Sequence, residues 1–110
     1  MLFRSLAQAV PTWAKREGFA NNPQAVAGAK LFAQSGCTAC HTYLGTGSSN
    51  LGAPDLSAIG KTNPDPKFFS SYVSDPSKFG NNVMPKFGNL GSKQNIHNIG
   101  VFLSVSKGPK

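Results

Sequence analysis

The sequence predicts an all-α protein with a single domain, in which three or more helices are joined by long loops. Three segments carry helix start and stop signals, and no segment alternates apolar and polar residues as a half-buried strand does. The 110 residues include 12 Gly and 8 Pro, many of them between these segments. Such a composition leaves a modest apolar core, so we expect something besides core burial to stabilise the fold.

Residues 1–21 form an N-terminal extension in which apolar residues recur at spacings of three and four. This pattern predicts one face of a short helix that ends near Pro11 or just after it. We expect the face to pack against the domain; a membrane-surface contact, or a junction with a membrane subunit, is the alternative. The face consists of Leu2, Phe3, Leu6, Val10 and Trp13.

The first of the three helices begins after Asn22, which caps it, and has Pro23 in its first turn. Its apolar face runs to about Ser35, and Gly36 is well placed to end it. The turn after this helix therefore carries the motif CTACH, at positions 37–41. The face consists of Ala25, Gly28, Ala29, Leu31 and Phe32.

A long loop over residues 42–64 follows the motif, because this stretch is rich in Gly, Ser, Asn and Pro and has little periodicity. Asp65 and Pro66 then restart a helix that must stop before Pro76. A loop of this length in a small domain is uncommon without a functional reason. We therefore expect it to wrap an object.

A second loop covers residues 78–91, after which Ser92 caps the last helix. This helix is expected to end before Gly108 and Pro109. Its apolar residues fall on one stripe, which predicts a buried face. The stripe consists of Ile96, Ile99, Phe102 and Leu103.

The motif CTACH places Cys37, Cys40 and His41 within five residues. Its two thiols can add across the two vinyl groups of one haem, and the next residue can place its imidazole on the iron. The two-residue spacing lets a single turn bring both sulfurs to neighbouring pyrrole rings. We therefore predict one covalent haem c, attached through Cys37 and Cys40, with His41 as an iron ligand.

Three other interpretations of the motif are weaker. A disulfide between Cys37 and Cys40 would close too small a loop to stabilise much, and it would leave His41 unexplained. A thioredoxin-like redox pair needs a preceding strand and a βαβ context, and the sequence has neither. A zinc site could also use His97, but adjacent Cys40 and His41 are poorly placed for two tetrahedral vertices.

Met84, in the segment NNVMPKFG, is the best candidate for the second iron ligand. The only other methionine is Met1, and a loop methionine flanked by Asn and Pro belongs to no apolar stripe, so a role as core filler is less attractive. Pro85 stiffens the backbone beside the sulfur. His97 is the rival, but it lies in the last helix on what should be the outward face.

Lys and Arg number 11 against 4 Asp and Glu, a formal charge of +7. This charge favours an acidic protein surface, an anionic lipid surface or nucleic acid as partner. The lysines are spread singly along the chain rather than grouped in a stripe with aromatic residues, so we expect no nucleic-acid partner. No run approaches the roughly 18 apolar residues of a membrane span.

Four ordered motifs together resemble the class I (mitochondrial-type) cytochrome c family, over about residues 22–107. GAKLFAQSGCTACH resembles the first helix of the family and its haem motif, VFLSVSK the last helix, GAPDL the Gly-Pro-x-Leu segment and MPKF the methionine loop. Two residues depart from the family pattern: Ala53 lies between Gly52 and Pro54, and Gly36 is an extra residue before Cys37. The resemblance assigns residues 22–110 to one cytochrome c domain.

The resemblance implies contacts between named residues. The first and last helices should cross where Gly28 admits a close approach, and Phe32 should meet Phe102. The carbonyl of Pro54 should accept the free ring N–H of His41, and Leu56 should lie on the porphyrin.

It also implies a function, which is to carry single electrons between respiratory or photosynthetic redox partners without enzyme activity. The alternatives are a domain of a larger oxidase or quinol-oxidising complex, since ACHTYLG, NLGAPDL and VSDPSKF look most like cytochrome domains of bacterial respiratory complexes, and a haem enzyme or sensor with an open distal site.

Haem attachment takes place outside the cytoplasm, so the mature domain is expected in the periplasm or on the outer face of the cytoplasmic membrane. The chain shows no clear signal peptide, because it lacks the apolar run of about 7 residues that export needs. The expected partners are acidic redox proteins or a membrane respiratory complex. They should dock at an exposed haem edge flanked by the lysines Lys78, Lys86, Lys30 and Lys61.

Overall fold

Asn22, Asp65 and Ser92 each begin a helix where the sequence predicted one. In the computed structural model, which describes residues 8–49, 52–88 and 92–108, these residues precede α3 (Pro23–Gln34), α4 (Pro66–Ser74) and α5 (Lys93–Val105). Each side chain accepts a hydrogen bond from a backbone N–H of the first turn, at 3.1, 2.9 and 3.2 Å respectively. These bonds satisfy amide groups that have no partner within the helix.

The prediction that the N-terminal helix ends near Pro11 is wrong. Helix α2 (Val10–Glu17) has Pro11 in its first turn and ends at Gly18, whose φ of 81° is left-handed. A proline in the first turn removes no helical hydrogen bond, so the helix continues through it. Val10 and Trp13 are both 1% exposed and pack in the core, as expected. Leu2, Phe3 and Leu6 lie outside the described residues.

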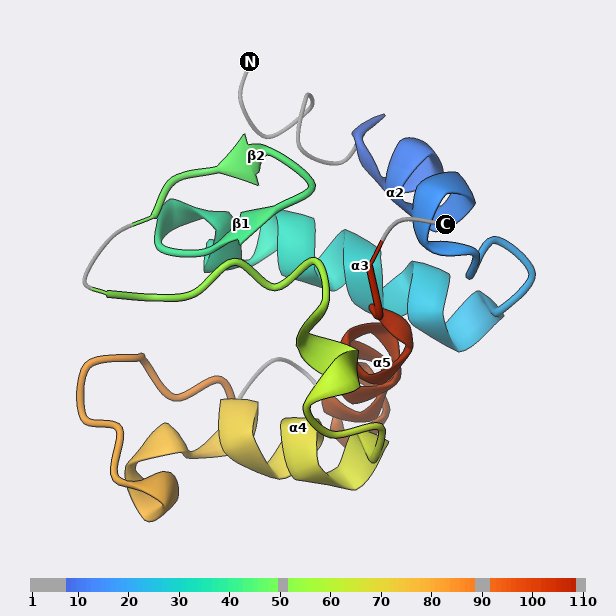
Figure 1. The fold of residues 1–110 in the computed structure, drawn as a ribbon. Coiled ribbons are helices and arrows are strands. Elements are labelled where there is room, and N and C mark those ends of the chain that lie inside the picture. The colour runs from blue at the N-terminus through green and yellow to red at the C-terminus, as the bar shows by residue number, and fades with distance from the viewer. Residues whose placement is uncertain (1–7, 50–51, 89–91, 109–110) are drawn as a thin grey trace.

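Helices α3 and α5 pack against each other and cross, with α3 seen from the side and α5 nearly end-on in Figure 1. Gly28 lies at the crossing, where an added Cβ would overlap the backbone carbonyl of Asn98. The rings of Phe32 and Phe102 lie 5.3 Å apart, which confirms the contact that the resemblance implied. The buried stripe predicted for the last helix is likewise confirmed.

Trp13 joins the same core, with its ring 4.7 Å from that of Tyr43 and 6.3 Å from that of Phe102. The described part of residues 1–21 thus shares the core of the rest of the chain. The predicted boundary between this extension and the domain over residues 22–110 stays a prediction.

A short hairpin interrupts the first long loop, where no strand was expected. Strands β1 (Thr42–Tyr43) and β2 (Thr46–Gly47) pair antiparallel, and the two residues between them, Leu44 and Gly45, have φ of 47° and 82°. A two-residue turn with both φ values positive matches the twist of paired strands. Two-residue strands are too short to show alternation in a sequence. The all-α class is confirmed all the same.

The two predicted loops lie on one side of the molecule, drawn in green and in orange in Figure 1. Within the described residues, the first contains the short 3-10 helix η2 (Ile59–Lys61), and η3 (Pro76–Phe79) overlaps the start of the second. The loops and α4 surround the cavity described below. Within the described residues, no helix is both long enough and apolar enough to span a membrane.

Candidate functional site

The two cysteines and His41 leave the end of α3 in one tight turn. Gly36 takes a left-handed conformation with φ of 87°, which favours glycine, and the 3-10 helix η1 (Cys37–Ala39) follows. The carbonyl of Cys37 accepts hydrogen bonds from the amides of Cys40, at 3.2 Å, and His41, at 2.9 Å. The extra residue Gly36 therefore does not disturb the turn but starts it.

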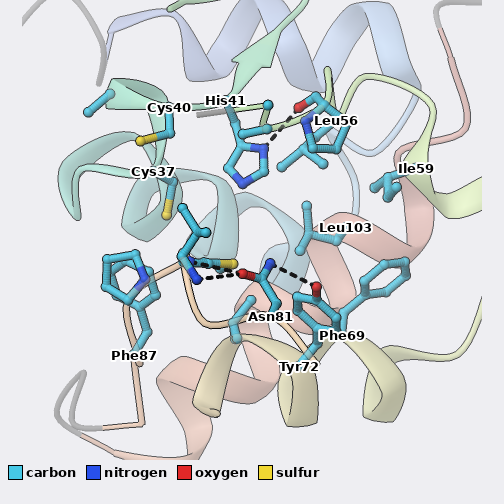
Figure 2. Close-up of a pocket in the computed structure, with 18 of the residues that line it drawn as sticks. Cys37, Cys40, His41, Leu56, Ile59, Phe69, Tyr72, Asn81, Phe87 and Leu103 are labelled. Atoms are coloured by element: carbon cyan, nitrogen blue, oxygen red, sulfur yellow. Dashed lines mark hydrogen bonds between the residues drawn. The ribbon is translucent and has the colours of Figure 1, made fainter. Parts of the chain in front are cut away.

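A cavity of about 620 Å³ gathers all six predicted site residues, which are Cys37, Cys40, His41, Pro54, Leu56 and Met84. Its other walls are mainly apolar and come from α4, α5 and both loops. They include Ile59, Phe68, Phe69, Val73, Phe87 and Leu103. Figure 2 shows the two sulfurs and the ring of His41 on one side of this space, with Asn81, Tyr72 and Phe69 across from them.

The imidazole of His41 is held by the loop that carries Pro54. Nδ1 lies 2.9 Å from the carbonyl oxygen of Pro54, which is the contact that the resemblance implied. A carbonyl can only accept, so Nδ1 must carry the proton, and Nε2 keeps its lone pair for a metal. The same loop is held in place by Leu56, whose amide donates to the carbonyl of Thr42 at 2.9 Å. Ala53, the other departure from the family pattern, leaves this contact intact.

Both thiols are free, and burial raises the pKa of the Cys37 thiol to about 11. The Cys37 side chain is therefore protonated at neutral pH, and it is a poor nucleophile toward adventitious electrophiles. Among the described residues, no three His, Cys, Asp or Glu side chains gather as a metal site. The zinc interpretation thus has no geometric support.

Met84 lines the cavity, whereas His97 does not. His97 is half-buried on α5, and so less solvated than the sequence suggested. The backbone of Met84 is fixed by Asn81, whose Oδ1 accepts from the amide of Met84 at 3.0 Å. The amide of Phe87, after Met84, donates to the carbonyl of Val73 in α4 at 2.8 Å.

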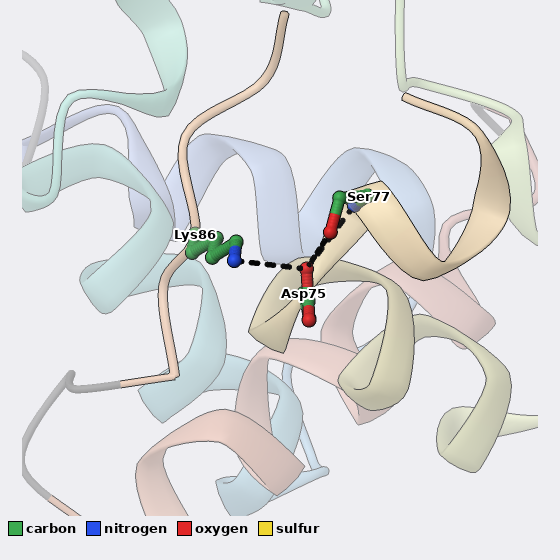
Figure 3. Close-up of polar contacts among 3 residues, drawn as sticks. All are labelled: Asp75, Ser77 and Lys86. Atoms are coloured by element: carbon green, nitrogen blue, oxygen red, sulfur yellow. Dashed lines mark hydrogen bonds and ion pairs between the residues drawn. The ribbon is translucent and has the colours of Figure 1, made fainter. Parts of the chain in front are cut away.

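Lys86, next to the methionine segment, forms an ion pair with Asp75 at 3.7 Å. Figure 3 shows Asp75 between Lys86 and Ser77, the latter in η3. The hydrogen bond from the Ser77 hydroxyl, together with the charge of Lys86, holds the pKa of Asp75 below its usual value. The Lys86 side chain is still 66% exposed, and Lys78, Lys30 and Lys61 are exposed as well. None of these lysines lines the cavity, so their place around a haem edge stays a prediction.

Asn81, Tyr72 and Asp75 were not expected from the sequence. Asn81 had a local signal, since an Asn two or three residues before a backbone amide commonly accepts from it in a turn. The contact of Tyr72 with Asn81 and that of Asp75 with Lys86 had none, because these partners lie nine or more positions further along the chain, whereas the bonds from Ser77 to Asp75 are local.

Residues 25–103 match the model of the cytochrome c family. The comparisons with curated proteins and with solved structures gave no match.

Proposed function

We propose that this chain, which belongs to the cytochrome c family, carries single electrons through one haem that Cys37 and Cys40 bind covalently and that His41 and Met84 ligate. Membership of the family implies a haem-based electron carrier. The finer proposal is supported by one observation: the two thiols, the imidazole and the thioether all line one apolar cavity.

The residues of the cavity fit a haem. Its volume of about 620 Å³ lies in the range of cofactor sites, about 300–1,000 Å³. The two cysteines come from one turn, and His41 offers Nε2 because Pro54 holds Nδ1. When bound, haem supplies a one-electron couple between ferric and ferrous iron.

The protein residues set how that couple behaves. The carbonyl of Pro54 fixes the orientation of His41 and makes its ring a better donor. The soft thioether of Met84 favours the ferrous state, which raises the potential. The apolar walls formed by Leu56, Phe69 and Leu103 exclude water and so disfavour the additional positive charge of ferric iron.

His41 and Met84 would together hold the iron of the haem and leave no position for a substrate, which favours a carrier over a haem enzyme or sensor with an open distal site. The net charge of +7 supports acidic redox proteins, or an acidic surface of a membrane respiratory complex, as partners. We place the mature domain in the periplasm or on the outer face of the cytoplasmic membrane, because covalent haem attachment belongs to that compartment.

The ferric holoprotein tests this proposal by its near-infrared spectrum. A weak charge-transfer band from sulfur to iron is expected, and Met84→Ala should abolish it and lower the potential. His97→Ala is the matched control and should leave both unchanged. The ligand assignment is wrong if the Met84 variant keeps the wild-type spectrum while the His97 variant alters it.

A further inference from the structure

Asn81 connects the methionine segment to helix α4 through three hydrogen bonds. Its Oδ1 accepts from the amides of Val83, at 2.9 Å, and Met84, at 3.0 Å. Its Nδ2 donates to the hydroxyl of Tyr72, in α4, at 3.0 Å. Figure 2 shows this side chain between the segment and the aromatic wall of the cavity.

The segment around Met84 has no helix or strand to hold it. Gly80 ends η3 with a left-handed φ of 84°, and the next backbone anchor after Met84 is the bond from Phe87 to α4. Between these points, the described hydrogen bonds to the main chain of Val83 and Met84 both end on Asn81. The place of the Met84 backbone therefore depends on one side chain.

Fixing that backbone matters because methionine has a long side chain with three rotatable bonds. A sulfur on a mobile backbone would spread over many positions, and ligation would have to overcome that entropy. With the backbone fixed, only the rotamers of the side chain remain to be ordered on ligation. The half-buried Asn81 is thus placed to reduce the free-energy cost of ligation.

We propose that Asn81 is a positioning residue for the axial methionine: it holds the backbone of Met84 and ties it to Tyr72, so that the thioether is presented to the haem iron. This inference rests on the proposed ligation by Met84. It differs from an ordinary loop turn, in which Asn81 would stabilise the folded protein without affecting how firmly the sulfur is held.

Displacement of the sulfur by a competing ligand separates the two roles. We would titrate the ferric holoprotein with imidazole and follow the near-infrared band, in wild type, Asn81→Ala and Asn82→Ala. Asn82 is the matched control because it is the same residue type, adjacent in sequence, and exposed. Asn81→Ala should bind imidazole about tenfold more tightly than wild type, and Asn82→Ala should match wild type.

Two further variants keep the test decisive if Asn81→Ala fails to fold. Asn81→Asp retains an oxygen that accepts both amides, and its other oxygen can accept from the Tyr72 hydroxyl, so its imidazole affinity should stay within about threefold of wild type. Asn81→Ser has a shorter and weaker acceptor, and its imidazole affinity should fall between those of Asn81→Asp and Asn81→Ala.

Equal imidazole affinities in the Asn81 and Asn82 variants would overturn the positioning role, even if Asn81→Ala unfolds more easily. A near-infrared band that Met84→Ala leaves unchanged, and that imidazole does not remove from wild type, would overturn the proposed ligation as well. The two failures are distinguishable, because only a failure of the ligation would also give wild type and Met84→Ala the same near-infrared spectrum.

Discussion

Oε1 of Glu17, at the end of α2, accepts a hydrogen bond of 3.0 Å from the amide of Gly108, 91 positions further along the chain. The side chain of Glu17 is only 2% exposed. Its other oxygen, Oε2, is buried and has no hydrogen-bond partner among the described residues. The bond ties the N-terminal helix to the residues after α5, but at the cost of burying a carboxylate that is only half satisfied.

This burial predicts that stability depends on pH through Glu17. Loss of solvation raises the pKa of Glu17 above its ordinary value of 4.5, although backbone bonds from Gly108 and Lys107 offset part of the effect. The folded state therefore holds the proton more tightly than the unfolded state. The contribution of protonated Glu17 to the free energy of unfolding is fully present below the pKa that Glu17 has in the unfolded state. It is lost as pH rises through the pKa that Glu17 has in the folded state.

Glu17→Gln removes the titration while keeping an oxygen that can accept from Gly108. Urea unfolding of wild type and variant, at about pH 4 and about pH 7, measures the difference between their free energies of unfolding. Relative to the variant, wild type should be more stable at the lower pH than at the higher. A difference that does not change with pH would show that Glu17 does not titrate in this window.

Gly28→Ala should destabilise the protein, because the new Cβ would overlap the carbonyl of Asn98 where α3 meets α5. Overpacking of this kind costs about 1–3 kcal/mol, which outweighs the gain of about 0.5–1 kcal/mol that Ala offers over Gly in a helix interior. Denaturant unfolding of wild type and variant measures the change in the free energy of unfolding.

Lys30→Ala, on the exposed face of the same helix, is the control for Gly28→Ala and should change the free energy of unfolding by less than about 0.5 kcal/mol. An unchanged stability in the Gly28 variant would mean that the two helices do not approach as closely as the structure has them.

Expression with haem-attachment machinery should give a polypeptide whose mass is increased by one haem, resistant to extraction with acidified acetone. Replacement of both Cys37 and Cys40 by Ala removes both thiols and should give the bare mass. Intact-protein mass spectrometry makes the measurement. A bare wild-type mass, or a second haem, would contradict the predicted attachment.

Lys86→Gln should slow electron transfer with an acidic partner at low ionic strength and have little effect at high ionic strength, where charges are screened beyond about 3–10 Å. Neutralisation is preferable to charge reversal, since a carboxylate at Lys86 would repel Asp75. Stopped-flow rates at several salt concentrations give the comparison.

Lys15→Gln changes the net charge by the same amount, but Lys15 lies on α2, none of whose residues lines the cavity. It should have a smaller effect than Lys86→Gln. Equal effects would indicate steering by net charge alone. A wild-type rate independent of salt would indicate apolar or intramolecular docking, as in a domain fused to its partner.

The sequence by itself determined the features that depend on neighbouring residues. Asn22, Asp65 and Ser92 cap helices within the next few positions, so their signals are complete in a short window. The motif at Cys37–His41 is equally local. The sequence also predicts Met84 as the second ligand, because Met1 is the only other methionine.

Only the tertiary structure decided the features whose partners are distant. Trp13 is buried against Tyr43 and Phe102, and the buried Glu17 accepts a hydrogen bond from Gly108. The links from Asn81 to α4 and from Lys86 to Asp75 likewise join separate segments. Such contacts form only when the chain has closed its loops, and no short window of sequence records which segments that closure brings together.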